Sequence, residues 1–401
     1  MRYSFRLAEL INHKPDPRRR PGTIKAIVER TGLDRHQVAA LLKNEVKYIP
    51  LDALSRICDY LIETGRVSPD QLPGALFAVE PEHFWELLAR RKRLELCVGV
   101  RRAEPDNSYD GAWIVASDAV LMGELLNGVT TLGGTSRHQL EGDAIAAALT
   151  GMGQPARPPH PELLRQQLVW SPGQSADEHV VARAQEVHRA FINAAEDKAL
   201  VCLGSTKSNP VVELIIAEAF GCTPFESQGD VPTPRRRNAP FYFRYRDNDP
   251  HPLSCCGGTV LSKAKEPTVP GIYYEQADGS WAVCPWSADG QDAALVFYIH
   301  RESQGQLEMV LCGFSGRSTR LLAKMLSSRA EAFWPAVYEG QGLQIGAFVV
   351  KFNLSGDAEV DGDLLRTDLT AGIDVIPLSA AVIERRLKPV AVADLATAKP
   401  R

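Results

Sequence analysis

The stretch from Thr23 to Leu42 restricts the fold of this chain more than any other stretch. Apolar residues recur in it at helical spacing, first up to Gly32 and again after Asp34. Glycine tolerates the positive φ at which many helices end, and aspartate is a favoured N-cap whose charge suits the helix dipole. The pattern therefore predicts two short helices that are joined by a tight turn.

The second predicted helix has a polar outer face. Arg35, His36 and Gln37 lie in its first turn, and Lys43 lies at its end. A short helix that presents such side chains from a rigid partner helix is what reading the major groove of DNA requires. Any pair of solvated helices has the same spacing, so a hairpin that binds nothing remains an alternative at this point. The candidate DNA-binding residues are Lys25, Arg35, His36, Gln37 and Lys43.

The residues that follow carry a family resemblance. From Lys43 to Leu61 the chain reads KNEVKYIPLDALSRICDYL. This run resembles the part of a Cro/C1-type helix-turn-helix domain that closes the recognition helix and begins the next helix. The resemblance covers residues 1–76 and implies an all-α domain that binds double-stranded DNA. Val28 departs from the family pattern, which usually has a small residue at that place.

The charge distribution agrees with that expectation. Residues 1–76 contain 13 Lys and Arg against 9 Asp and Glu, a net charge of +4. The other 325 residues contain 32 Lys and Arg against 40 Asp and Glu, a net charge of −8. A basic head on an acidic body is suited to phosphate contact by the head alone.

Three sequence features bear on the compartment. No apolar run approaches the roughly eighteen residues that a membrane-spanning helix needs, and no signal-peptide core follows the first six residues. The eight cysteines are scattered, without a C-x-x-C pair or a Cys/His set at zinc spacing. We therefore expect a cytoplasmic protein that has no membrane segment and no metal site.

Beyond residue 93 the pattern changes to strands that alternate with helices. Such alternation predicts an α/β body with a Rossmann-like, mostly parallel sheet. The predicted strands share short apolar runs of the kind found in buried strands, and they cover residues 94–100, 112–116, 199–203, 294–300, 308–311 and 345–352.

With 401 residues the chain is too long for one ordinary domain. Its first helix is expected at Tyr3–Asn12, and a hairpin is expected around Asp278 and Gly279. A division of the α/β body at residue 198 stays open. The predicted order is a helix-turn-helix domain over 1–76, a linker helix over 77–93, the Rossmann-like region over 94–390 (as one unit, or as 94–197 and 198–390), and a flexible tail over 391–401.

Two glycine-bearing loops occupy equivalent places in the predicted body, each between an apolar strand and a helix. Open α/β sheets bind ligands at such places, and unpaired backbone N–H groups at a helix N-terminus favour an anion. Any strand-to-helix turn of this kind prefers Gly and Ser, so a purely structural role is the alternative. The candidate ligand-binding residues are Gly204, Ser205, Thr206, Lys207, Ser208 and Asn209 in the first loop, and Gly313, Ser315, Gly316, Arg317, Ser318 and Thr319 in the second.

No convincing catalytic set accompanies these loops. His300 and Cys312 could suggest a nucleophile pair, but no third group orients them, and we assign no catalytic residue. The sequence therefore predicts a DNA-binding transcriptional regulator whose body senses a small anionic, nucleotide-like ligand and forms a homodimer. No cofactor is assigned with certainty. The alternatives are an enzyme that hydrolyses or modifies a nucleotide, and a body that serves only for assembly.

Overall fold

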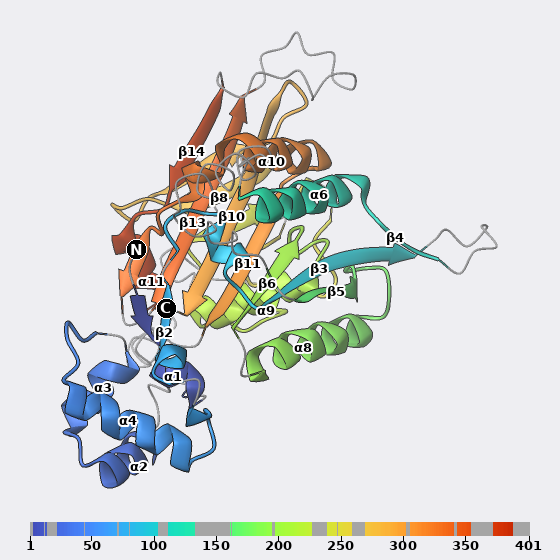
Figure 1. The fold of residues 1–401 in the computed structure, drawn as a ribbon. Coiled ribbons are helices and arrows are strands. Elements are labelled where there is room, and N and C mark those ends of the chain that lie inside the picture. Colours follow the sequence, from blue (N-terminus) through green and yellow to red (C-terminus); the bar gives the residue numbers. More distant parts are fainter. Residues whose placement is uncertain are drawn as a thin grey trace, which may run out of the picture.

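The structure is a computed structural model in which a small helical head precedes a larger α/β body (Figure 1). It describes most of both parts, whereas the predicted tail 391–401 lies outside the described residues. The described residues are 3–11, 13, 22–43, 45–69, 72–79, 81–102, 111–132, 161, 163–194, 197–226, 239–246, 248–258, 269–301, 305–340, 343–353 and 372–387.

The predicted helix pair of the head is confirmed. Helix α2 (Gly22–Thr31) ends before Gly32, whose φ is 65°, and α3 (Arg35–Leu42) begins after its N-cap Asp34. Helix α4 (Leu51–Glu63) follows and packs against α2. The side chains that form the core between these helices are the ones that recur at helical spacing, namely Ile27, Val38, Leu41, Leu42, Ala53, Ile57 and Leu61.

The expectation of a helix over Tyr3–Asn12 is wrong in its first part. Residues Tyr3–Phe5 form strand β1, and helix α1 covers only Leu7–Leu10. Strand β1 pairs antiparallel with β2 (Phe77–Val79), which follows the 3-10 helix η2 (Gly74–Leu76). The partner strand is more than seventy residues away, so a local pattern could not reveal it.

The body is built on one nine-stranded mixed sheet. Its strands β5, β3, β6 and β11 are neighbours in that order and run parallel, whereas β10, β13 and β14 continue the sheet as antiparallel neighbours. The α/β class is therefore confirmed, with parallel pairing confined to one half of the sheet. The strands are β3 (Arg93–Arg102), β4 (Ala112–Ile114), β5 (Leu163–Trp170), β6 (Lys198–Leu203), β10 (Gln291–Arg301), β11 (Gln306–Gly313), β12 (Tyr338–Gly340), β13 (Leu343–Asn353) and β14 (Ile373–Pro377).

Both faces of the central strands of this sheet are buried, which explains the continuous apolar runs in their sequence. Alternate residues of each central strand point to opposite faces, as Cys202 and Val201 of β6 do. Helices α6 and α10 lie side by side on one face, and α8 and α9 lie on the other (Figure 1). Their bounds are α6 (Ala116–Thr131), α8 (Asp177–Asn193), α9 (Pro210–Phe220) and α10 (Gly316–Arg329).

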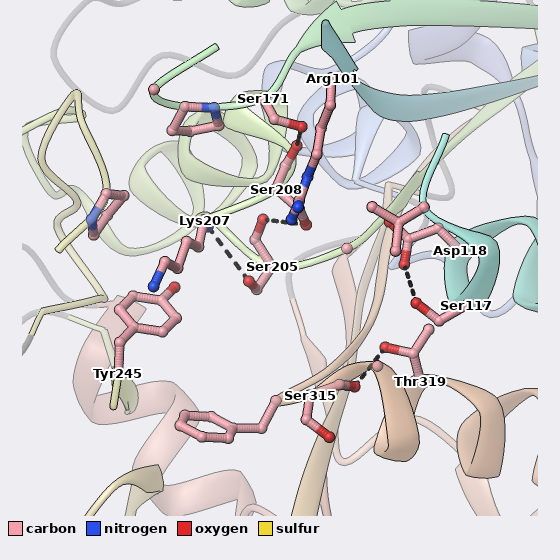
Figure 2. A pocket seen from close by; sticks show the side chains of 18 of the residues that line it. Arg101, Ser117, Asp118, Ser171, Ser205, Lys207, Ser208, Tyr245, Ser315 and Thr319 are labelled. Carbon is pink, nitrogen blue, oxygen red and sulfur yellow. Dashed lines mark hydrogen bonds between the residues drawn. The ribbon is translucent and has the colours of Figure 1, made fainter. Parts of the chain in front are cut away.

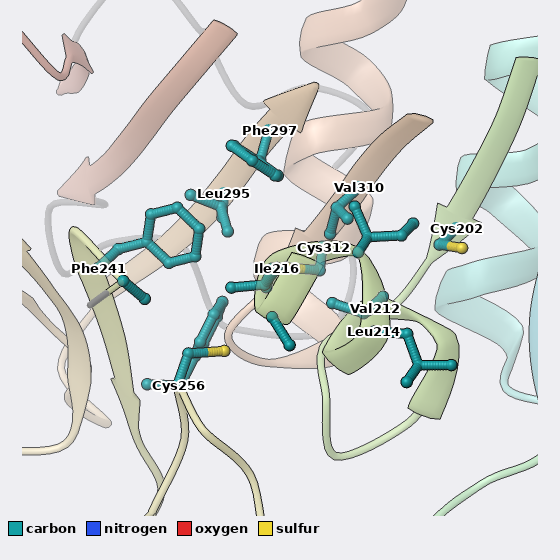
Figure 3. Packing of buried hydrophobic residues seen from close by; sticks show 14 of the residues in the cluster. Cys202, Val212, Leu214, Ile216, Phe241, Cys256, Leu295, Phe297, Val310 and Cys312 are labelled. Atoms are coloured by element: carbon teal, nitrogen blue, oxygen red, sulfur yellow. The ribbon is translucent and has the colours of Figure 1, made fainter. Parts of the chain in front are cut away.

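A small second sheet covers the α9 side of the body. Strands β7 (Phe241–Arg244), β8 (Gly271–Glu275) and β9 (Trp281–Pro285) are antiparallel, and the predicted hairpin around Asp278 and Gly279 joins β8 to β9. Figure 3 shows Phe241 of this sheet and Ile216 of α9 in one apolar cluster with Leu295 and Phe297 of β10. Short helices α5 (Glu86–Ala89), η5 (Ala330–Phe333) and α11 (Ala380–Leu387) complete the described elements.

The order of the parallel strands determines where a cavity can form. Strands β6 and β11 are adjacent, but the helix after β6 covers one face and the helix after β11 covers the other. The two chain segments thus separate at the carboxyl ends of these strands and leave space between them. None of the described helices is long and apolar enough to cross a membrane.

Candidate functional site

The outer face of α3 carries the predicted DNA-binding side chains. Asp34 caps this helix, since its carboxylate accepts hydrogen bonds from the backbone N–H of His36 at 2.7 Å and of Gln37 at 3.3 Å. Arg35, His36 and Lys43 are exposed, and Gln37 is half-buried. The cap and the apolar inner face fix the helix, so these polar side chains project from a rigid element.

Lys25 lies on a different helix from the other four candidates. Its side chain is exposed on α2 and lies 3.6 Å from the carboxylate of Glu29. An exposed ion pair of this kind contributes little to stability and is screened by salt. Lys25 is therefore available to a DNA phosphate, but it does not share the face formed by α3.

The two predicted loops of the body meet at one cavity of about 530 Å³ (Figure 2). The cavity lies at the carboxyl ends of β3, β6 and β11, where the backbone N–H of Gly204 bonds to the carbonyl of Leu311 at 3.0 Å. Eight of the twelve candidate residues line it: Gly204, Ser205, Lys207, Ser208, Gly313, Ser315, Gly316 and Thr319.

The other four candidates build the framework behind the cavity. Asn209 is fully buried, and its amide donates to the carbonyl of Cys97 within β3 at 2.9 Å and to that of Leu203 at the end of β6 at 3.1 Å. The hydroxyl of Thr206 shares a hydrogen bond of 2.7 Å with the hydroxyl of Tyr245. Ser318 belongs to the capping box of α10, and the Arg317 guanidinium lies 3.5 Å from the carboxylate of Asp292.

The backbone N–H groups of the described loops are only partly bonded within the loops, and those of Ser205, Thr206 and Gly316 have no hydrogen bond to the described residues. The amides of Lys207, Ser208 and Asn209 all donate to Ser205. At the start of α10, the Ser315 hydroxyl accepts from two amides, and the Ser318 hydroxyl accepts from the amide of Ser315. The groups that an anion in this cavity would meet are therefore the lining cations Lys207, Arg101 and Arg246 and the amides of Ser205 and Gly316.

The comparisons with known proteins bear on the head alone. Residues 18–64 match the Cro/C1-type HTH DNA-binding domain. The match includes α2, α3 and α4, so the resemblance of the N-terminal region to this family is confirmed. No curated protein and no solved structure matches the chain.

Sequence reasoning missed a third strand-to-helix junction. Ser117 and Asp118 begin α6, directly after β4, and line the cavity together with Arg101 of β3. Figure 2 shows them across the cavity from Lys207 and Tyr245. The signal was present, because a predicted strand at 112–116 precedes a helix there, but the junction lacks glycine and so does not resemble the other two loops.

Asp118 is the most unusual group in the cavity wall. Its side chain is only 5% exposed, and the Ser117 hydroxyl donates to it at 3.5 Å. Burial raises the pKa of this carboxyl group, and the opposing effects of the Arg101 charge and the Ser117 hydroxyl are smaller. A buried carboxyl group in a cavity is a group that can accept a hydrogen bond or a proton from a ligand.

An aromatic stack forms another part of the wall. The ring of Tyr245 lies between those of Phe243 and Phe314, with centroid distances of 6.2 and 6.3 Å and interplanar angles of 14° and 16°. The ammonium group of Lys207 lies 5.2 Å from the centre of the Tyr245 ring. Burial raises the pKa of Tyr245, so its phenol stays neutral near pH 7.

Three potential metal ligands lie together outside this cavity. One ligand atom from each of Glu213, Cys255 and Cys256 lies within 4.8 Å of the others, and all three residues are buried. The Glu213 carboxylate already accepts from the amides of Cys255 and Phe225 at 2.7 and 2.9 Å and from the Ser254 hydroxyl at 2.6 Å. Hydrogen bonds and burial raise the pKa of the Cys255 thiol. The hydrogen bond with Cys255 lowers the pKa of the Cys256 thiol, but burial and the Glu213 charge raise it overall. Two thiols that resist ionisation fit a structural cluster better than a metal centre.

Proposed function

We propose that this protein is a transcriptional regulator whose α/β body binds a small anionic ligand and joins two copies of the chain. One observation carries the proposal. A Cro/C1-type HTH DNA-binding domain is joined to a body in which loops from three strand ends converge on one cavity lined by Lys207 and Arg101. Ligand occupancy would alter the spacing of two heads and hence their affinity for DNA, provided that the ligand binds one arrangement better than the other.

Reading of DNA is assigned to α3. Base contacts from Arg35 and Gln37 would each contribute about 1–3 kcal/mol to discrimination. The combined Arg35→Ala and Gln37→Ala variant should therefore lower the affinity for DNA upstream of the protein's own gene by about tenfold or more at moderate salt. Arg66→Ala is the matched control, because this exposed arginine of the head follows α4. Unchanged binding by the double variant would refute the assignment of α3.

Ligand binding is assigned to the cavity through Lys207. A panel of nucleotides, inorganic phosphate and pyrophosphate should include a compound that raises the thermal transition of the body, because a ligand of the folded state stabilises it. Lys207→Met keeps the length of the side chain and removes its charge, and should abolish that shift. Lys92→Met serves as the control, since Lys92 is exposed at the start of β3. A full shift in Lys207→Met would place the ligand elsewhere.

Dimerisation is assigned to the edge of β5 that pairs with no other described strand. This strand pairs with β3 on one side, and Leu163, Leu164 and Leu168 are 59%, 59% and 44% exposed. An exposed apolar edge strand favours pairing with another chain. Antiparallel pairing with a second copy around Gln166 would place Leu164 against Leu168 of the second copy. A two-fold axis at Gln166 would form this leucine pair twice, once on each side of the axis. Two heads per assembly are also what a pair of DNA half-sites requires.

The assembly is tested by the mass of the protein in solution. The wild type should be a dimer, and Leu164→Lys combined with Leu168→Lys should be a folded monomer whose thermal transition is lower only by the stabilisation that the dimer supplies. Ile62→Lys is the control, because it introduces the same charge at an exposed apolar position of the head. A monomeric wild type would refute dimerisation, and a dimeric double variant would refute the role of β5.

A second candidate function is an enzyme that modifies or hydrolyses a nucleotide. The observation that favours it is the buried Asp118 carboxyl group in the cavity wall, because burial raises its pKa towards the range in which general bases operate. Mass analysis of nucleotide mixtures after incubation should then reveal products with the wild type but not with Asp118→Asn. Intact nucleotides in both samples would leave the sensor as the function of the cavity.

A further inference from the structure

The proposed ligand site contains one strong acceptor that the protein itself barely satisfies. Asp118 is 5% exposed, yet the donor that the described residues supply is the Ser117 hydroxyl at 3.5 Å, the outer limit of a hydrogen bond. An ionised carboxylate has room for about four donors, and buried polar groups normally have their partners. The remaining acceptor capacity faces the cavity, so a bound ligand must donate hydrogen bonds there (Figure 2).

A simple anion does not meet this requirement. Phosphate near pH 7 offers mainly acceptor oxygens, so it cannot supply the donors that Asp118 lacks, whereas the Lys207 ammonium across the cavity can donate to it. The ligand must therefore combine an anionic group with neutral hydroxyl or amine donors at some distance from it. This separation of the two ends restricts the class of ligand.

The aromatic wall restricts it further. Phe314 is half-buried, lines the cavity and is stacked on Tyr245. A ring held in this way offers a flat apolar surface, on which a planar ring of a ligand stacks favourably. The volume of about 530 Å³ lies in the range of sites for molecules of mononucleotide size.

We infer that the cavity is a ribonucleotide site in which the sugar hydroxyls donate to Asp118, the phosphate lies at Lys207 and the base stacks on Phe314. The inference rests on the proposed ligand site and names its chemistry. An acidic side chain near the carboxyl ends of parallel strands is a suitable acceptor for a ribose diol. Asp118 thereby becomes the residue that distinguishes ribonucleotides from nucleotides without sugar hydroxyls.

The test compares matched ligands by titration calorimetry on the full chain. The ligands are the four ribonucleoside 5′-monophosphates, their 2′,3′-dideoxy counterparts and inorganic phosphate. A charge-assisted hydrogen bond accounts for a difference of about ten- to a hundredfold in affinity, so at least one ribonucleotide should bind that much more tightly than its dideoxy counterpart. Asp118→Asn should remove this preference and leave the affinity of the dideoxy compound unchanged.

Stability supplies the control for the Asp118→Asn variant. A buried carboxylate with a single weak donor costs free energy, and a neutral amide of the same shape removes that cost, so Asp118→Asn should not lower the thermal transition at pH 7. Phe314→Ala should lower the affinity for ribonucleotides and for dideoxynucleotides by the same factor. It should leave the affinity for phosphate unchanged.

Two results would overturn the inference in distinguishable ways. Equal binding of ribonucleotides and dideoxynucleotides to the wild type, or an undiminished preference in Asp118→Asn, refutes the contact between ribose and Asp118 while the anion site remains. If neither the nucleotides nor phosphate binds, both the inference and the proposed ligand site fail.

Discussion

Helix α6 contains two glycines with opposite surroundings, Gly123 and Gly128. A methyl group built at Gly128 would lie 2.0, 2.3 and 2.4 Å from the Cη2, Cζ2 and Cζ3 atoms of the Trp85 indole. The indole is 5% exposed and packs edge-to-face on Phe84 at 5.3 Å, so it has little room to move. A methyl group at Gly123 would meet no heavy atom within 4 Å.

Alanine at the two positions should therefore have effects of opposite sign. Alanine in place of glycine inside a helix stabilises by about 0.5–1 kcal/mol, and Gly123→Ala should show this gain in full. Overpacking costs about 1–3 kcal/mol, which at Gly128 offsets or exceeds the same gain. The two variants should thus differ in the free energy of unfolding by about 1–3 kcal/mol, or about 2–6 °C in the thermal transition.

Urea unfolding followed by fluorescence measures this difference directly. Trp85→Leu in the Gly128→Ala background should recover part of the loss, because it removes the indole atoms that the methyl group meets. If Gly128→Ala is stabilised as much as Gly123→Ala, the segment that joins head to body does not pack on α6 as described, and the reasoning is refuted.

Three further variants test buried and capping polar groups. Burial alone would raise the pKa of Glu308, but the Arg301 charge and the His188 hydrogen bond lower it to about 2. Stability from Glu308 should be present above its unfolded pKa near 4.5, and it should decline as the pH falls towards 2. The stability that His188 contributes depends on pH in the opposite direction. Its pKa is raised by Glu308 despite burial, so the contribution is complete below pH 6.5 and declines as the pH rises above that value. Glu308→Gln should cost about 3 kcal/mol at pH 6 and remove the acid-side decline, as measured by urea unfolding. Asn209→Ala leaves two buried carbonyls without their donor and should cost about 2 kcal/mol or more in the same assay. Asp34→Ala should weaken DNA binding at pH 7 without shifting the transition of the body, because backbone hydrogen bonds that lower the Asp34 pKa hold the start of α3.

The sequence alone determined the helical head, because its signals are local. Helix hydrogen bonds join residues four apart, and the signals at Gly32 and Asp34 mark the end of α2 and the start of α3 without reference to the rest of the chain. The strand at Tyr3–Phe5 is the exception, since its partner β2 lies at the other end of the head. A local helical pattern there is overridden by a distant pairing.

The sequence also located most of the loops that form the candidate site. An apolar run followed by glycine and polar residues marks the carboxyl end of a buried strand wherever it occurs, which is why 204–209 and 313–319 stood out. It did not show that capping side chains occupy several of the backbone N–H groups of these loops. Those hydrogen bonds depend on side-chain geometry, and the choice between Ser315 as a cap and Ser315 as a ligand contact is made only in three dimensions.

The tertiary structure decided which residues share the cavity. The register of β3 with β6 joins residues about one hundred positions apart, and β6 with β11 spans a similar distance. Strand order sets which carboxyl ends are neighbours, and the helices on alternating faces open the space between them. Asp118, on the helix that follows β3 and β4, faces Lys207 for this reason alone. No spacing along the chain encodes that arrangement, because pairing between distant strands depends on the free energy of the whole sheet.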